Sequence, residues 1–107
     1  MTRYAVTWRD RAGLIRSGRL EPGSRGLRLE SGSRRSGRVT VLRVLYRDVL
    51  KADMAASATR VGGRPTVALT LKNGVLAIAP TGAGLAREVL GLLQSGCLAD
   101  SERAGVE

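Results

Sequence analysis

The chain has 107 residues and a formal net charge of +9, with 18 basic residues of which only Lys51 and Lys72 are lysines. This length fits one domain with a single core. Histidine is absent and Cys97 is the only cysteine, which excludes a His-based catalytic triad, a zinc cluster and an intramolecular disulfide. No segment approaches the roughly 18 apolar residues of a membrane span. The sequence therefore predicts a soluble, cytoplasmic protein with no metal and no cofactor.

All of the net charge lies in the first half of the chain. Residues 1–60 hold 14 basic and five acidic residues, whereas the charges of residues 61–107 cancel. Such an asymmetry is typical of a protein that binds an anionic surface, either membrane phospholipid headgroups or nucleic acid. A codon bias toward arginine also explains the high arginine count, but it does not explain the asymmetry.

Short strands are predicted in the first half. Tyr4, Val6 and Trp8 alternate with polar or small residues, and this pattern indicates a strand over 3–9 with Tyr4 and Trp8 in the core. Turn residues at 10–13 and 21–23 separate it from further strands over 14–20 and 27–29.

The segment "SGSRRSGR", Ser31–Arg38, joins the strand at 27–29 to a strand that begins at Val39. Arg34 and Arg35 in a Gly/Ser turn could bind an oxyanion. The segment lacks the strand–loop–helix setting of a phosphate-binding loop. We interpret it as a mobile, solvated hairpin tip.

The segment Val41–Ser57 fits two kinds of structure. Its apolar residues alternate as in a strand, and they also recur at helical spacing among good helix formers. We expect Tyr46, which lies near its start, to be more exposed than Tyr4 and Trp8. Asp48 and Asp53 are expected to form salt bridges with Arg47 or Lys51, because the chain offers them no partner nucleophile and no metal-binding cluster. Periodicity alone leaves strand and helix open.

The second half has clearer signals. The stretch "TVALTLKNGVLAIAP", Thr66–Pro80, alternates on both sides of Asn73-Gly74 and predicts a β-hairpin with a type I′ turn. An amphipathic helix is predicted over Leu85–Ser95, with Gly96 as its C-terminal cap. Residues 97–107 lack periodicity and are expected to form a flexible tail in which Cys97 is an unreactive thiol.

This order of short strands, tight hairpin and terminal helix resembles the pleckstrin-homology-like (PH-like) domains of bacteria. The resemblance rests on "LYRDVLKADMA" at Leu45–Ala55, "GRPTVALTLKNGVLAIAP" at Gly63–Pro80 and the helix Leu85–Ser95. It implies a mainly β fold, an antiparallel barrel of about seven strands closed by one C-terminal amphipathic helix, over residues 1–96. Val41–Ser57 would then be strand, and the helix would close the barrel with the four apolar residues Leu85, Val89, Leu92 and Leu93.

In this family, phosphoinositide binding uses basic residues on the first two strands and their loop. The candidates here for anion binding are Arg9, Arg11, Arg16 and Arg19, together with Arg34 and Arg35. Arg16 and Arg19 are three residues apart, so in a strand they point to opposite faces. The tryptophan of the eukaryotic domains' terminal helix is also missing. We therefore interpret the group as the charged outer face of a sheet.

No catalytic constellation is present, and the chain is not expected to be an enzyme. The sequence predicts a non-catalytic module that binds another protein through an open strand edge or the groove beside the helix. The alternative is weak electrostatic binding of anionic lipid or nucleic acid through the basic half. Whether the chain forms a homo-oligomer is left open.

Overall fold

The computed structural model describes residues 3–33, 37–82 and 84–105. Its elements are, in order, β1 (Tyr4–Arg9), β2 (Ile15–Pro22), β3 (Gly26–Ser33), β4 (Arg38–Leu45), the 3₁₀ turn η1 (Tyr46–Asp48), β5 (Val49–Met54), the 3₁₀ turns η2 (Ser57–Thr59) and η3 (Val61–Gly63), β6 (Val67–Leu71), β7 (Gly74–Pro80) and α1 (Leu85–Gly105). The predicted fold class is confirmed: the described chain is mainly β, with seven antiparallel strands and one C-terminal helix.

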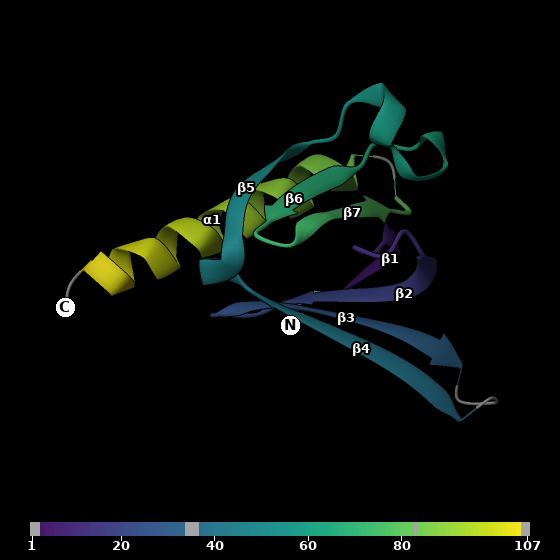
Figure 1. Ribbon diagram of the computed structural model, residues 1–107, viewed down its shortest axis with the longest axis horizontal. Coiled ribbons are helices and arrows are strands. Elements are labelled where there is room, and N and C mark those ends of the chain that lie inside the picture. The colour runs from purple at the N-terminus through teal and green to yellow at the C-terminus, as the bar shows by residue number, and fades with distance from the viewer. Residues whose placement is uncertain (1–2, 34–36, 83, 106–107) are drawn as a thin grey trace.

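The seven strands form one sheet in the order β4-β3-β2-β1-β7-β6-β5. Strand β1 is central, because it pairs with β2 on one side and with β7 on the other. The sheet curls into a half-barrel in which β2, β3 and β4 form one arm, while β5, β6 and β7 form the other arm with α1 behind them (Figure 1). The end strands β4 and β5 are not hydrogen-bonded to each other, so the barrel stays open along one seam.

Glycine permits the tight coiling of the first arm. Gly18 in β2 lies opposite Ser31 in β3. A Cβ at Gly18 would collide with the backbone carbonyl of Glu30. The two strands can therefore approach this closely only without a side chain at position 18.

The core lies between the concave face of the sheet and α1. Trp8 and Tyr4 are buried as predicted, and they share the core with Leu29, Leu69 and other apolar residues from the inner face of the strands. Val89 and Leu93 of α1 are fully buried against them. Leu92 was expected on the same face, but 40% of it is exposed, because the helix places its buried stripe one residue further along.

The segment Val41–Ser57 is mostly strand, but a short turn interrupts it. β4 ends at Leu45, η1 covers Tyr46–Asp48, and β5 begins at Val49. The expectation that Tyr46 is exposed is wrong, since only 3% of it is accessible. The turn points the ring inward against α1, and the hydroxyl donates a hydrogen bond of 2.9 Å to the carbonyl oxygen of Gly23.

The β6–β7 hairpin is confirmed, but its turn is one residue earlier than predicted. Leu71 pairs with Gly74, so Lys72 and Asn73 form the loop. Among the described residues only glycines have positive φ, and Gly74 has φ 141°. The type I′ assignment, which requires a positive φ at Asn73, is therefore wrong.

The predicted end of the helix is also wrong. α1 continues past Gly96 to Gly105, so most of the expected tail, 97–107, is helical. Gly96 is not a cap, because it lies against the ring of Tyr46, where a Cβ would be 2.5 Å from the ring carbons. Within the described part of the chain, no helix has the length and apolar character needed to cross a bilayer.

The connection within Ser31–Arg38 is shorter than the sequence suggests. Ser31, Gly32 and Ser33 belong to β3, and Arg38 belongs to β4. The tip that contains Arg34 and Arg35 lies outside the described residues.

Candidate functional site

A groove runs between β5 and α1 at one end of the sheet. The groove has a volume of about 300 Å³. It is lined by residues of β5 and of the second half of α1: Val49, Leu50, Lys51, Ala52, Gln94, Cys97 and Leu98. Leu50 is 62% exposed and Leu98 is 63% exposed, so the groove carries two large apolar side chains that the fold itself does not bury.

The exposure of Leu50 has a local cause. β5 pairs with β6 through Val49 opposite Leu71 and then Lys51 opposite Thr70, so Leu50 is an extra residue in the ladder. Such a bulge bends the strand and redirects the bulged side chain. Leu50 therefore points to solvent although its neighbours Val49 and Ala52 pack against the core.

Gln94 connects α1 to the strand. Its side-chain amide donates a hydrogen bond of 2.9 Å to the backbone carbonyl of Ala52. This carbonyl belongs to β5, the end strand of the sheet. It accepts this hydrogen bond from a side chain rather than from a neighbouring strand. Because Gln94 is exposed, the contact can exchange with water or with another backbone donor.

Tyr46 and Cys97 lie beneath this groove. Burial, and then the neighbouring Cys97, raise the pKa of the Tyr46 hydroxyl, although the hydrogen bond to Gly23 acts in the opposite sense. Burial and then the carboxylate of Asp100 raise the pKa of the Cys97 thiol. Both groups are therefore neutral near pH 7, and the thiol lacks the activation that a nucleophile needs.

The opposite end strand, β4, has a different surface. Val39, Val41 and Leu45 are exposed on it, and Arg43 lies between Val41 and Leu45 at the same two-residue spacing. Their partners on β3 are Gly32, Glu30, Gly26 and Arg28, which form the outer face of the first arm.

The predicted anion-binding residues do not come together. Arg9 and Arg11 line a depression on the outside of the second arm, beside Asp53, and Arg11 also lines the cavity next to the β6–β7 turn. Arg16 lies opposite Trp8, whereas Arg19 lies opposite Ala5, so the two point to opposite faces as expected. The guanidinium of Arg16 pairs with Asp10 at 3.6 Å.

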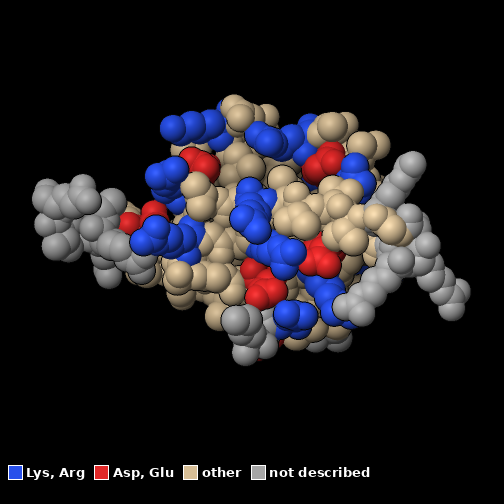
Figure 2. Space-filling view, turned by 90° about the horizontal axis from the view of Figure 1, so that it is seen from below, with Lys and Arg blue, Asp and Glu red and all other residues tan. Residues whose placement is uncertain are grey.

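Two further arginines are paired with acidic residues. Arg3 pairs with Glu21 at 3.4 Å, and Arg28 pairs with Glu30 at 3.0 Å. Figure 2 shows one face of the molecule from below, where acidic side chains are interspersed among more numerous basic ones. On the second arm, Asp53 pairs with Lys51 at 3.1 Å as predicted, but no ion pair joins Asp48 to Arg47 or Lys51 in the described structure.

Sequence reasoning pointed to the groove but did not identify its residues. Leu50 and Gln94 belong to β5 and α1, which are far apart in the sequence. Ala52 and Gln94, which are joined by a hydrogen bond, are 42 residues apart. The bulge at Leu50 is visible only once the register with β6 is known. Leu98 lies in the stretch 97–107, which has no periodicity, so no pattern in the sequence marked it.

Comparison with protein-family models and with curated proteins gave no match. Among solved structures, the chain is similar to the C-terminal domain of an unknown protein from Leishmania infantum. The TM-score is 0.69 and the identity is 11%, over 92% of this chain and 83% of that one. A likeness at this identity defines the shared fold.

Proposed function

We propose that this chain is a non-catalytic PH-like domain that binds an extended segment of another protein along β5, in the groove beside α1. The observation that carries the proposal is the pair of exposed leucines, Leu50 and Leu98, beside an end strand of the sheet. An added strand would take main-chain hydrogen bonds from β5, and a side chain of the ligand would pack between the two leucines.

The contact made by Gln94 supports the same interpretation. The side-chain amide of Gln94 already donates a hydrogen bond to a backbone carbonyl of the end strand β5. A ligand strand would replace that single side-chain hydrogen bond with a ladder, so binding would not leave the carbonyl of Ala52 without a donor.

The electrostatic alternative has less support from the geometry. Arg16 is paired with Asp10, and Arg28 with Glu30. Arg9 and Arg11 lie apart from Arg19. An anionic surface would then meet an interspersed pattern of charges rather than one basic patch.

Selection from a random peptide library on the full chain tests the proposal. We expect selected peptides to shift the amide resonances of β5 and of α1 near Leu98. Leu98→Lys should weaken their binding by about tenfold or more, because it places a charge where the apolar contact lies. The matched control is Leu14→Lys, since Leu14 is also exposed, at 55%, but lies away from the groove.

Two results would contradict the proposal. One is an equal loss of affinity in Leu14→Lys and Leu98→Lys. The other is binding that collapses between about 50 and 200 mM salt, which counterion release predicts for the electrostatic alternative.

A further inference from the structure

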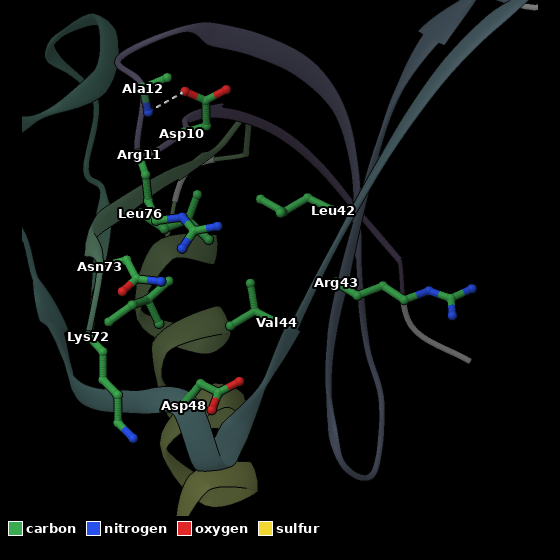
Figure 3. Close-up of a pocket in the computed structure, with 11 residues that line it drawn as sticks. Asp10, Arg11, Ala12, Leu42, Arg43, Val44, Asp48, Lys72, Asn73 and Leu76 are labelled. Atoms are coloured by element: carbon green, nitrogen blue, oxygen red, sulfur yellow. Dashed lines mark hydrogen bonds between the residues drawn. The ribbon is translucent and has the colours of Figure 1, made fainter.

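A second cavity lies at the open seam of the half-barrel and is separate from the β5–α1 groove. It has a volume of about 490 Å³, which is within the usual range for small-molecule sites. One wall is β4, and the other is the β6–β7 turn together with the β1–β2 loop (Figure 3). The cavity exists because β4 and β5 do not pair and close the barrel.

The walls of this seam cavity combine charged and apolar side chains. Leu42 and Val44 come from the inner face of β4, and Leu71 and Leu76 come from the facing hairpin. Leu42 and Leu71 are only partly buried by the fold. An apolar ligand would cover them and gain the corresponding transfer free energy.

Arg11 supplies a cationic group at one end. In Figure 3 its guanidinium points into the cavity, whereas the side chain of Arg43 points away from it. The methylenes of Arg11 lie over Gly74, 3.5–3.9 Å from where a Cβ would be, so the turn supports the arginine stem in this position.

The nearest acidic residue does not neutralise Arg11. One carboxylate oxygen of Asp10 accepts hydrogen bonds of 3.0 Å from the backbone N–H groups of Ala12 and Leu14, and the other faces Arg16. In the part of the chain that the structure describes, no ion pair joins Arg11 to a carboxylate. Its forked donors are therefore available to a ligand.

We propose that the seam cavity binds a single-chain carboxylate, with its head on Arg11 and its apolar chain against Leu42 and Leu71. A single guanidinium matches the two oxygens of a carboxylate in a bidentate arrangement. Asp48 and Lys72 lie at the other end of the same cavity, where their opposite charges offset each other. Arg11 therefore balances the single charge of a carboxylate but not the two charges of a phosphate head. This site is independent of peptide binding at β5.

Titration calorimetry of the full chain with decanoate, below its micelle concentration, tests this site. We expect saturable binding of one decanoate, weaker binding of decyl phosphate and none of decyltrimethylammonium, which has the same chain and the opposite charge. Arg11→Gln should weaken decanoate binding by about tenfold or more, because the charge-assisted hydrogen bonds are lost. Arg19→Gln is the matched control, since Arg19 lies on the outer face of the sheet.

A second variant tests where the apolar chain of decanoate lies. Leu42→Trp should fill the cavity and remove decanoate binding, and the thermal unfolding of the variant shows whether it is folded. Absence of saturable decanoate binding to the wild-type chain would overturn the proposal. So would equal binding of decyltrimethylammonium, or an equal effect of Arg19→Gln and Arg11→Gln.

Discussion

Strands β4 and β5 are the two ends of one sheet, and each has a strand partner on one side only. The fold protects these two edges in different ways. On β4, Arg43 interrupts a row of exposed apolar residues, and charge on an edge strand discourages pairing with another chain. On β5, the bulge at Leu50, the helix α1 and the amide of Gln94 cover the edge. Arg43 discourages pairing along β4, whereas the side-chain contact that covers β5 can be exchanged for a ligand strand, and this difference favours β5 as the proposed site of binding.

The largest expected effect is a difference in stability between substitutions at two neighbouring residues of α1. Leu93→Asp would bury an unpaired carboxylate in the core and should lower the free energy of unfolding by roughly 3–5 kcal/mol. Leu92→Asp should lower it by only about 1–2 kcal/mol, because Leu92 is 40% exposed and aspartate is a poorer helix former than leucine. Urea denaturation of both variants measures the difference. Similar losses in the two would mean that α1 does not cover β5 with the face described.

A second pair of substitutions tests how closely α1 approaches η1. Gly96→Ala should destabilise the chain by about 1–3 kcal/mol, since the new methyl group would meet the ring of Tyr46. Gly91→Ala should instead stabilise it by up to about 1 kcal/mol, because alanine favours the helix and open space surrounds position 91. Thermal unfolding of the two variants gives the signs. A stabilising Gly96→Ala would show that the helix does not lie against Tyr46.

The contact that covers β5 should have a smaller effect. Gln94→Ala removes one exposed hydrogen bond to Ala52 and should lower stability by about 0.5–1.5 kcal/mol. Hydrogen exchange should become faster along β5 and stay unchanged along β4. Equal acceleration in both strands would remove the distinction between the two edges.

The smallest effect concerns pH. Tyr46 and Cys97 have raised pKa values in the folded chain, so folding favours their protonated forms. Stability is then fully present below about pH 9.0, the ordinary value of the thiol, and declines as the pH rises through the folded values. Urea denaturation near pH 8 and near pH 10 should show this decline in stability. Cys97→Ala is the control variant. A decline of the same size in Cys97→Ala would leave no role for the thiol.

Local patterns in the sequence predicted what depends on local geometry. The alternation around Trp8 and the two strands of the β6–β7 hairpin follow from the period of a strand, and the buried Val89 follows from the period of a helix. The same rules failed where a contact with a residue distant in the sequence determines the local structure. Gly96 has the sequence signal of a cap, yet it serves as the gap that admits the ring of Tyr46, 50 positions earlier in the chain.

The candidate sites were harder to predict than the fold. Arg9, Arg11, Arg16 and Arg19 are close in sequence, but strand alternation and the β1–β2 loop send them in different directions. The groove at Leu50 and the seam cavity at Arg11 both depend on which strands fail to pair. That information is tertiary, and no window of the sequence contains it.

During synthesis, β1 can pair with β2 almost at once, but its other neighbour, β7, ends only at Pro80. Contacts between such distant segments form slowly, because the entropy of the long intervening loop is lost before the contacts are gained. In a partly synthesised chain that contains only β1–β4, the core-facing side chains of Trp8 and Leu29 would be exposed to water. We therefore expect the docking of the β6–β7 hairpin and α1 to limit the rate of folding, and the nascent first arm to be the species most prone to aggregation.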